Sequence, residues 1–240
     1  MTPGQMHLLR LRPVFFLPSL AKEEEMSDLT TRLHACYSGA VHDVLRAMGH
    51  ENVVLPSNIR PLDPALKLAG PVWTVSGQIN RTLTRHETLL GWTRLLSKAP
   101  GGHVVVCQPH NHEVALMGEL SSETLKHKGV LGYVVDGGCR DAEFILNQKF
   151  PVFCSFYTPA DIVGRWLADR FGEPVTIGAV TICSGDYLLA DRDGVVIIPA
   201  KVAEEVVTET ERTMQTENKV RTAILSGVDP VEAYERYGKF

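Results

Sequence analysis

The adjacent pair Arg140-Asp141 is the feature of this sequence best suited to chemistry. It follows an apolar run at residues 133–136 and the glycines Gly137-Gly138, which predict a buried strand ending in a tight turn that a ligand can approach. Arginine offers a planar fork for a carboxylate or enolate, and aspartate offers a hard oxygen ligand for Mg²⁺. The pair therefore predicts an anion and metal site at the carboxyl end of a strand, where α/β proteins commonly bind ligands.

A second segment upstream has complementary chemistry. Gly118, Glu119, Leu120 and Ser121 precede a helical pattern, and backbone N–H groups at the start of a helix bind anions. Glu119 adds a second carboxylate. An Arg-Asp pair alone is also typical of a surface ion pair or of an N-cap aspartate, so both interpretations stay open at this point.

Other polar residues have weaker patterns. His110 and His112 share a face if they lie in a strand, where they could bind metal or substrate, although exposed loop histidines are commoner. The five cysteines are scattered singly, with Cys139 beside the Arg-Asp pair, and this pattern favours reduced, mostly buried thiols in a cytoplasmic protein.

The elements that must position these residues follow from periodicity and capping. Strands alternate with helices in the middle of the chain, and the later part is richer in strands. This order predicts an α/β fold, a layered α/β sandwich with a mixed central sheet, rather than a doubly wound sheet. Helices are expected over residues 27–49, 86–97, 121–128, 141–149, 201–226 and 230–237. The first should begin at the N-cap Ser27 and stop at Gly49. A strand is expected over residues 66–79, with a break at Gly70-Pro71.

Length and composition limit the classes of function. The 240 residues predict one domain over 26–240 preceded by an extension at 1–25. A net charge of −4 argues against direct binding of nucleic acid, and no segment has the roughly 18 apolar residues of a membrane span. Glycine-rich nucleotide loops and the common hydrolase motifs are absent from the sequence.

Four blocks of sequence resemble the RraA-like family, which includes 4-hydroxy-4-methyl-2-oxoglutarate aldolases, oxaloacetate decarboxylases and regulators of ribonuclease E activity. They cover nearly all of residues 38–199 in the family's order. The resemblance implies the family's swivelling β/β/α type of fold. The blocks are SGAVHDVLRAMG with LPSNIRPLDPALKLAGPVWTV, GELSSETLKHKGVLGYVVDGGCRDAEFI, FPVFCSFYTPAD and IGAVTICSGDYLLADRDGVVIIP.

The resemblance also implies roles for individual residues. Aldolases of the family have an acidic residue, twenty intervening residues and then Arg-Asp, and Glu119 and Arg140 have that spacing. By resemblance, Asp141 binds Mg²⁺ or Mn²⁺, Arg140 contacts the pyruvyl group, and Glu119 holds a water. The loop Gly118-Glu119-Leu120-Ser121 would bind the substrate carboxylate. An acid from a neighbouring subunit completes the family's site, and Glu217 is the expected residue.

The sequence departs from the family's pattern in two places. The acidic residue usual three positions after the Arg-Asp aspartate is Phe144 here, with Glu143 one place earlier. Gly102-His103 replaces the usual Gly-Asp before the loop. These differences leave the exact substrate open.

The function implied is that of a divalent-metal-dependent lyase that cleaves a C–C bond of a 2-oxo acid through a pyruvate enolate and also decarboxylates oxaloacetate. A homotrimer or homohexamer is expected. The alternative is a non-catalytic, protein-binding regulator of ribonuclease E-type RNA processing. Methyl transfer to a menaquinone ranks last, because no glycine-rich loop for S-adenosylmethionine follows a first strand.

Overall fold

A mixed sheet of eight strands forms the centre of the protein. The computed structural model describes residues 20–239, with side chains from Asp28 onward. Strands β2, β3, β4 and β6 run parallel to one another, and β1, β8, β11 and β12 add antiparallel pairs. The order is β1 (Arg60–Pro61), β6 (Val152–Cys154), β4 (Gly132–Val135), β3 (Val104–Gln108), β2 (Leu68–Ile79), β11 (Tyr187–Asp191) and β12 (Gly194–Ile198), with β8 (Trp166–Phe171) also on β2.

Alternate side chains of the central strands enter two different cores. On β3, Val105 and Cys107 face helices α3 (Arg85–Lys98), α4 (Glu119–His127) and α5 (Ala142–Gln148). Val104 and Val106 face the other side, where the hairpin of β9 (Val175–Ile177) and β10 (Val180–Ile182) packs. Strands buried on both faces read as continuous apolar runs, which explains the sequence VVVCQ.

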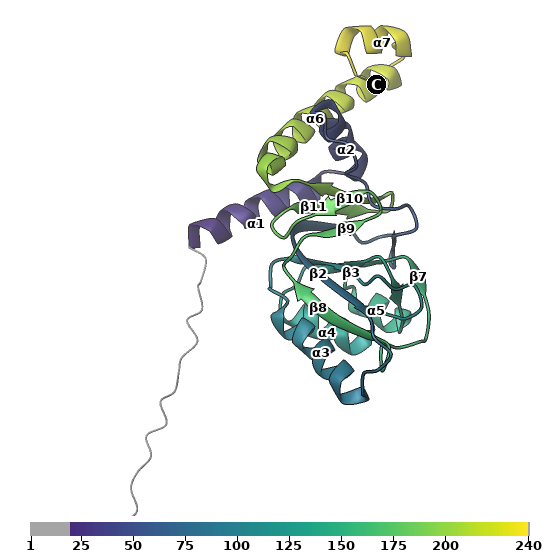
Figure 1. Ribbon diagram of the computed structural model, residues 1–240. Helices are drawn as coiled ribbons and strands as arrows, with labels where there is room; N and C mark the ends of the chain where they lie inside the picture. The colour runs from purple at the N-terminus through teal and green to yellow at the C-terminus, as the bar shows by residue number, and fades with distance from the viewer. Residues whose placement is uncertain (1–19, 240) are drawn as a thin grey trace, which may run out of the picture.

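A second group of helices packs around β11 and β12. Helices α1 (Leu20–Ala35), α2 (Ser38–Ala47) and α6 (Ala203–Leu225) share a third core with these strands. Arg32 of α1 pairs with Glu211 of α6 at 2.9 Å. Figure 1 shows α6 rising away from the sheet and leading to α7 (Pro230–Tyr237), so that the two helices form an arm; a 3₁₀ turn at Ala200–Val202 precedes α6.

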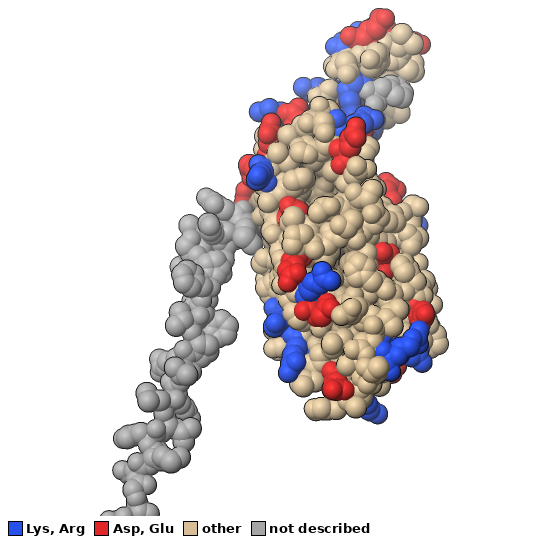
Figure 2. Space-filling model, in the orientation of Figure 1, with Lys and Arg blue, Asp and Glu red and all other residues tan. Residues whose placement is uncertain are grey.

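The predicted fold class and most predicted elements are confirmed. Helix α7 has the predicted bounds because Asp229 caps it through the N–H groups of Val231 and Glu232 and Pro230 opens it. Gly49 follows α2 with φ of 82°, as expected of a helix stop. None of the described helices is long and apolar enough to cross a bilayer. On the face shown in Figure 2, acidic and basic side chains are interspersed.

Three local predictions, the cap at Ser27, the strand break at Gly70-Pro71 and the start of α4 at Ser121, are wrong. Ser27 lies inside α1, which already begins at Leu20. Strand β2 is continuous through Gly70-Pro71, because pairing with β3 starts only at Val72 and needs no donor from the proline. Most of the proposed extension at residues 1–25 lies outside the described residues, although its last six residues belong to α1. Helix α4 also begins at Glu119, two residues before the predicted Ser121.

Candidate active site

A short parallel ladder brings the two candidate segments together. Residues 115–117 run beside β5 (Gly138–Cys139), which in turn pairs with β7 (Phe156–Tyr157). The Leu116 N–H donates to the Gly138 carbonyl at 2.7 Å, and the Arg140 N–H donates to the Met117 carbonyl at 3.0 Å. These bonds place Arg140 next to the loop that begins α4, although the two lie more than twenty residues apart in the chain.

Asp141 connects the two segments through its side chain. Its Oδ2 accepts the Glu119 N–H at 3.1 Å and lies 3.4 Å from Arg140 Nε. Asp141 has φ of 55°, in the left-handed region, and its side chain makes no cap bond to its own helix α5. A carboxylate at the first amide of α4 is favourable because it satisfies an orphan donor and interacts with the helix dipole.

Gly118 is the residue that lets these groups approach one another. A Cβ on Gly118 would lie 2.7 Å from Asp141 Oδ2 and 3.3 Å from Arg140 Cγ and Nε. Its φ is −156°, so any residue could adopt the backbone. Glycine is therefore required by the space that the Asp141 carboxylate and Arg140 occupy.

These residues line a cleft of about 400 Å³. Its lining includes Ala115, Met117, the Arg140-Asp141 pair and the start of α4. Arg140 and Asp141 keep 41% and 37% of their side-chain surface exposed, so both can meet a ligand from solvent.

The rest of the lining comes from segments that the sequence analysis did not connect to the site. Arg85, Leu89 and Trp92 lie at i, i+4 and i+7 of α3, so they share one face of that helix. Trp92 Nε1 donates to Ser121 Oγ at 2.9 Å, which joins α3 to α4. Residues 161–163, including Asp161, close the remaining side. The sequence singles out none of these residues of α3 and 161–163, because their place in the cleft depends on how the two segments pack around the sheet.

The structure brings together every site residue predicted from this chain except Glu217. Those that line the cleft are Gly118, Glu119, Leu120, Ser121, Arg140 and Asp141. Ser122 makes the first i→i−4 bond of α4, to the Gly118 carbonyl at 3.0 Å. The N–H groups of Leu120 and Ser121 therefore have no intrahelical acceptor and are available to an anion.

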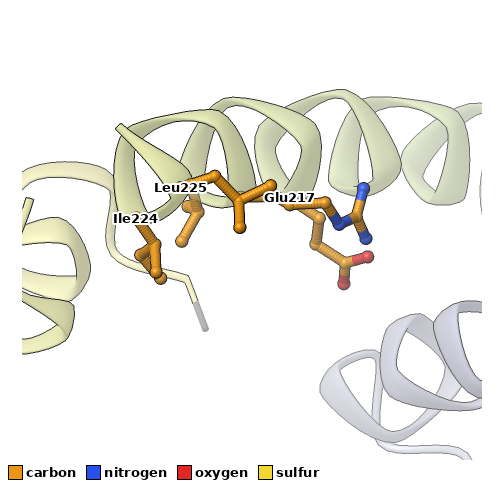
Figure 3. A pocket seen from close by; sticks show the side chains of 5 residues that line it. Glu217, Ile224 and Leu225 are labelled. Atoms are coloured by element: carbon orange, nitrogen blue, oxygen red, sulfur yellow. The ribbon is translucent and has the colours of Figure 1, made fainter. Parts of the chain in front are cut away.

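Glu217 lies on the arm and does not line the cleft of its own chain. It accepts a hydrogen bond from the Tyr37 hydroxyl and pairs with Lys239 Nζ at 3.3 Å. Burial and this contact with Glu217 raise the pKa of Tyr37 to about 12. Figure 3 shows Glu217, Ile224 and Leu225 along one side of α6, where they border an open groove. Its role in a neighbouring subunit's site stays a prediction.

The histidines lie apart from the cleft lining. His110 and His112 follow β3 in a loop rather than a strand, and His112 stacks on Phe156 with ring centroids 6.2 Å apart. His103 is held in its own turn, with Nδ1 2.9 Å from the Gly101 carbonyl oxygen. The departures Phe144 and Glu143 are exposed on α5 and likewise do not contribute to the cleft.

The structure also shows the surroundings of the glycines Gly137-Gly138 and of Cys139, which lie beside the Arg-Asp pair in the sequence. Gly137 and Gly138 are buried, and a Cβ on Gly138 would lie 2.8 Å from the Phe156 ring, so protein packing rather than ligand approach requires that glycine. Cys139 is fully buried, and a hydrogen bond with Cys154, together with burial, raises its pKa well above the ordinary value. Cys139 is thus a protonated core thiol. Cys183 is the exception among the five free cysteines, because it is exposed.

The carboxylates of the cleft fit a weakly held divalent ion. Asp141 Oδ1 makes no hydrogen bond within the described residues, and Glu119 provides a second acid in the same cleft. No group of three or more metal-binding side chains occurs among residues 28–239, whose side chains the structure describes. One or two carboxylates suit Mg²⁺ or Mn²⁺, which keep several waters, and do not suit a structural zinc site.

A profile of the RraA-like family, described as Aldolase/RraA, matches residues 38–197. The chain belongs to the RraA-like family. The match includes the cleft residues of α3, α4, the Arg-Asp turn and residues 161–163, and it stops before the arm.

Similar proteins carry names from both branches of this family. Protein DlpA of Legionella pneumophila is 30% identical over 91% of this chain, which spans only 35% of that relative's length. A protein of Halalkalibacterium halodurans, named as a candidate 4-hydroxy-4-methyl-2-oxoglutarate aldolase, is 26% identical, with 86% of this chain and 93% of that protein covered. The crystal structure of Streptomyces coelicolor RraAS2, described as an unusual member of the RNase ES inhibitor RraA protein family, has a TM-score of 0.73 at 26% identity, with 81% of this chain and 97% of that chain covered.

Proposed function

We propose that the protein is a divalent-metal-dependent lyase that cleaves 4-hydroxy-4-methyl-2-oxoglutarate-type acids to pyruvate and also decarboxylates oxaloacetate. The observation that supports this best is the convergence of Arg140, Asp141, Glu119 and the free amides of α4 on one cleft. The names of relatives such as the H. halodurans protein support the same activity.

Binding of the substrate's C1 end would use the start of α4 and the Arg-Asp turn. The N–H groups of Leu120 and Ser121 would receive its C1 carboxylate at the positive end of α4. The Arg140 guanidinium would contact the 2-oxo oxygen, where negative charge develops. Asp141, with Glu119 nearby, would hold Mg²⁺ or Mn²⁺, and this ion would supply Lewis-acid stabilisation of the developing charge.

The proton movements follow from the same residues. Glu119 would orient a water that accepts the proton of the C4 hydroxyl, while the C3–C4 bond breaks and C4 becomes a carbonyl carbon. The electron pair of that bond would pass into a pyruvate enolate, whose negative oxygen Arg140 stabilises. Protonation at C3 would then release pyruvate. Loss of CO₂ from oxaloacetate gives the same enolate, so both reactions would use one site.

We also propose a closed homotrimer or homohexamer in which Glu217 of one chain reaches the cleft of its neighbour. The groove beside Glu217, lined by Val220, Ile224 and Leu225, is open in the single chain and supports contact at this surface. Closed rings are the usual outcome of such head-to-tail contacts when the rotation closes.

A regulator of RNA processing is the second candidate, and the likeness to RraAS2 favours it. It would act through a protein partner. A pull-down with a ribonuclease E scaffold segment tests this role, and Asp141→Asn should leave such binding unchanged because the cleft would not take part.

The lyase proposal is tested by pyruvate release from 4-hydroxy-4-methyl-2-oxoglutarate and from oxaloacetate. Activity should disappear in EDTA and return with excess Mg²⁺ or Mn²⁺, while EDTA already saturated with Mg²⁺ is the control and should have no effect. Undiminished activity after thorough chelation would contradict the metal dependence, and no pyruvate from either substrate would contradict the lyase.

A further inference from the structure

Arg85 is a cation of the cleft that the proposed reaction does not use. It lines the cleft from α3, and it has no ion-pair or hydrogen-bond partner among the side chains described, those of residues 28–239. Arg140, in contrast, lies 3.4 Å from Asp141. Arg81, four residues before Arg85, is paired with Glu113 at 2.7 Å. Arg85 therefore has a guanidinium in the cleft that is free for a ligand.

The fold fixes the position of Arg85. Thr84 and Glu87 form a reciprocal capping box around the first turn of α3, with Thr84 N–H to Glu87 Oε2 at 2.8 Å. Seven residues later, the Trp92–Ser121 hydrogen bond ties the same face of α3 to the start of α4. At 1.5 Å per residue, Arg85 lies roughly 10 Å along the helix axis from Trp92. It is therefore held toward the far end of the cleft.

The surroundings of Arg85 suit an organic anion rather than a free ion. Leu89 lies on the same face of α3. The Gly164 N–H donates to Thr88 Oγ1 at 3.0 Å, which holds the segment with Ile162 and Val163 against the first turns of that helix. All three apolar residues line the cleft. The acid of that segment, Asp161, accepts the Val163 N–H at 3.2 Å and makes no ion pair with Arg85. Apolar walls strengthen a hydrogen-bonded contact between a guanidinium and a carboxylate, and the fork of arginine matches both carboxylate oxygens.

We propose that Arg85 binds a second carboxylate, at the far end of the substrate, and so makes the enzyme selective for dicarboxylic over monocarboxylic 2-oxo acids. This inference rests on the proposed function for the placement of the near carboxylate at α4. With the C1 carboxylate and the 2-oxo group held at Leu120, Ser121 and Arg140, the carbon chain extends along the α3 face. Arg85 is the remaining cation that lines this cleft.

Binding measurements test the inference without catalysis. Titration calorimetry in the presence of Mn²⁺ compares 2-oxoglutarate with 2-oxopentanoate, which has the same carbon chain but a methyl group in place of the second carboxylate. The wild type should bind 2-oxoglutarate about tenfold more tightly, which corresponds to roughly 1.4 kcal/mol for one charge-assisted contact. Arg85→Gln should remove this preference and leave 2-oxopentanoate binding within twofold, and Arg85→Lys should restore part of it.

Arg94→Gln is the matched control, because Arg94 is an exposed arginine of the same helix that does not line the cleft. It should keep the full preference. A preference that survives in Arg85→Gln, or an equal loss for both ligands, would overturn the proposal.

A kinetic comparison separates this inference from the proposed function. Arg85→Gln should lower kcat/KM about tenfold for 4-hydroxy-4-methyl-2-oxoglutarate, mainly through KM, and leave the monocarboxylic 4-hydroxy-2-oxopentanoate unchanged. If the wild type cleaves neither compound, the lyase proposal fails while the binding comparison still decides the role of Arg85. If the wild type cleaves both and Arg85→Gln lowers both equally, the lyase stands and the role of Arg85 is refuted.

Discussion

The cleft beside Arg140 and the groove on α6 are built in different ways. The groove, of about 300 Å³, is lined by residues 217–225 of one helix and is mostly apolar. The cleft combines α3, the start of α4, the Arg-Asp turn and residues 161–163, which are far apart in the chain. Backbone donors, carboxylates and guanidinium groups meet in the cleft, whereas the groove has only the charged ends of Glu217 and Arg221 beside its apolar surface.

This difference shows why an apolar groove alone does not identify a catalytic site. Helical periodicity is enough to make an apolar stripe such as the one with Val220, Ile224 and Leu225. Val220 is buried and Leu225 is exposed, and exposed apolar residues that adjoin one another are typical of contacts with other chains. A site for bond cleavage needs groups of opposite charge at fixed positions, which several segments must supply. Variants in the cleft should therefore change catalysis, and variants on the arm should act through assembly.

The largest effect is expected at Asp141. Asp141→Asn removes the charge and keeps a side chain that tolerates the left-handed backbone conformation, so the fold should be retained. Lyase and decarboxylase activities should both fall by at least about 1,000-fold, because both need the metal's contribution of several kcal/mol. Pyruvate release measures the loss of both activities, and titration with Mn²⁺ measures the loss of metal binding. Circular dichroism is the control for folding. Metal binding equal to that of the wild type would show that Asp141 is not the ligand.

Arg140 should rank second. Arg140→Ala should cost roughly 3–4 kcal/mol of transition-state stabilisation, by analogy with loss of one preorganised donor at a developing oxyanion. Mn²⁺ affinity should stay largely intact. Arg140→Lys should recover only part of the rate, since a point charge lacks the two-pronged contact. Full activity of Arg140→Ala in steady-state kinetics would leave the surface ion pair as the better account of this residue.

Gly118→Ala tests the close approach at the start of α4. The added methyl group would meet Asp141 Oδ2 at 2.7 Å, so the carboxylate must move, and a displacement of this kind should lower kcat about 10- to 100-fold. Gly39→Ala is the matched control in α2, because its Cβ would meet only the Tyr37 ring at 3.5 Å. Unfolding temperatures should change little for either variant. Equal kinetic effects of the two changes would contradict the specific role of Gly118.

The smallest effect is expected at Glu217, and it connects the two regions. Glu217→Gln should lower kcat about tenfold if a neighbouring chain's acid completes the cleft. Mixing Glu217→Gln with Asp141→Asn chains under conditions of subunit exchange should then restore some activity, because some sites receive a wild-type residue from each chain. If light scattering shows a fully active monomer, or if mixing restores no activity, Glu217 does not complete a neighbour's cleft. Its role would then be structural, through its contacts with Tyr37 and Lys239.

Local signals in the sequence were sufficient where the structure depends on local contacts. The bounds of α7 follow from Asp229 and Pro230, and α3 was predicted within one residue at each end from its amphipathic periodicity. The layered fold followed from the alternation of buried strands and helices. The Arg-Asp turn and the loop before α4 were predicted as one site because their residue types are complementary and because the spacing of Glu119 and Arg140 resembles that of the family's aldolases.

The sequence failed where a distant residue decides the local structure. The start of α4 was predicted at Ser121 from side-chain capping, but Asp141, twenty-two residues beyond Glu119, supplies the acceptor. The wall formed by Arg85 and Asp161 depends on how α3 and residues 161–163 pack around the sheet, and no local pattern contains that information.

The left-handed backbone at Asp141 has an evolutionary consequence. At φ of 55°, most side chains are strained, and aspartate, asparagine and glycine are the residues best tolerated. Of these, only aspartate is an anion, and a longer acid such as glutamate would face both the backbone strain and a carboxylate displaced from the Glu119 amide. The backbone therefore limits which substitutions evolution can accept at this position. A lineage that replaces Asp141 with asparagine or glycine keeps the fold and loses the carboxylate. If the proposed lyase function holds, one codon change at Asp141 separates an enzyme from a binding scaffold with the same shape.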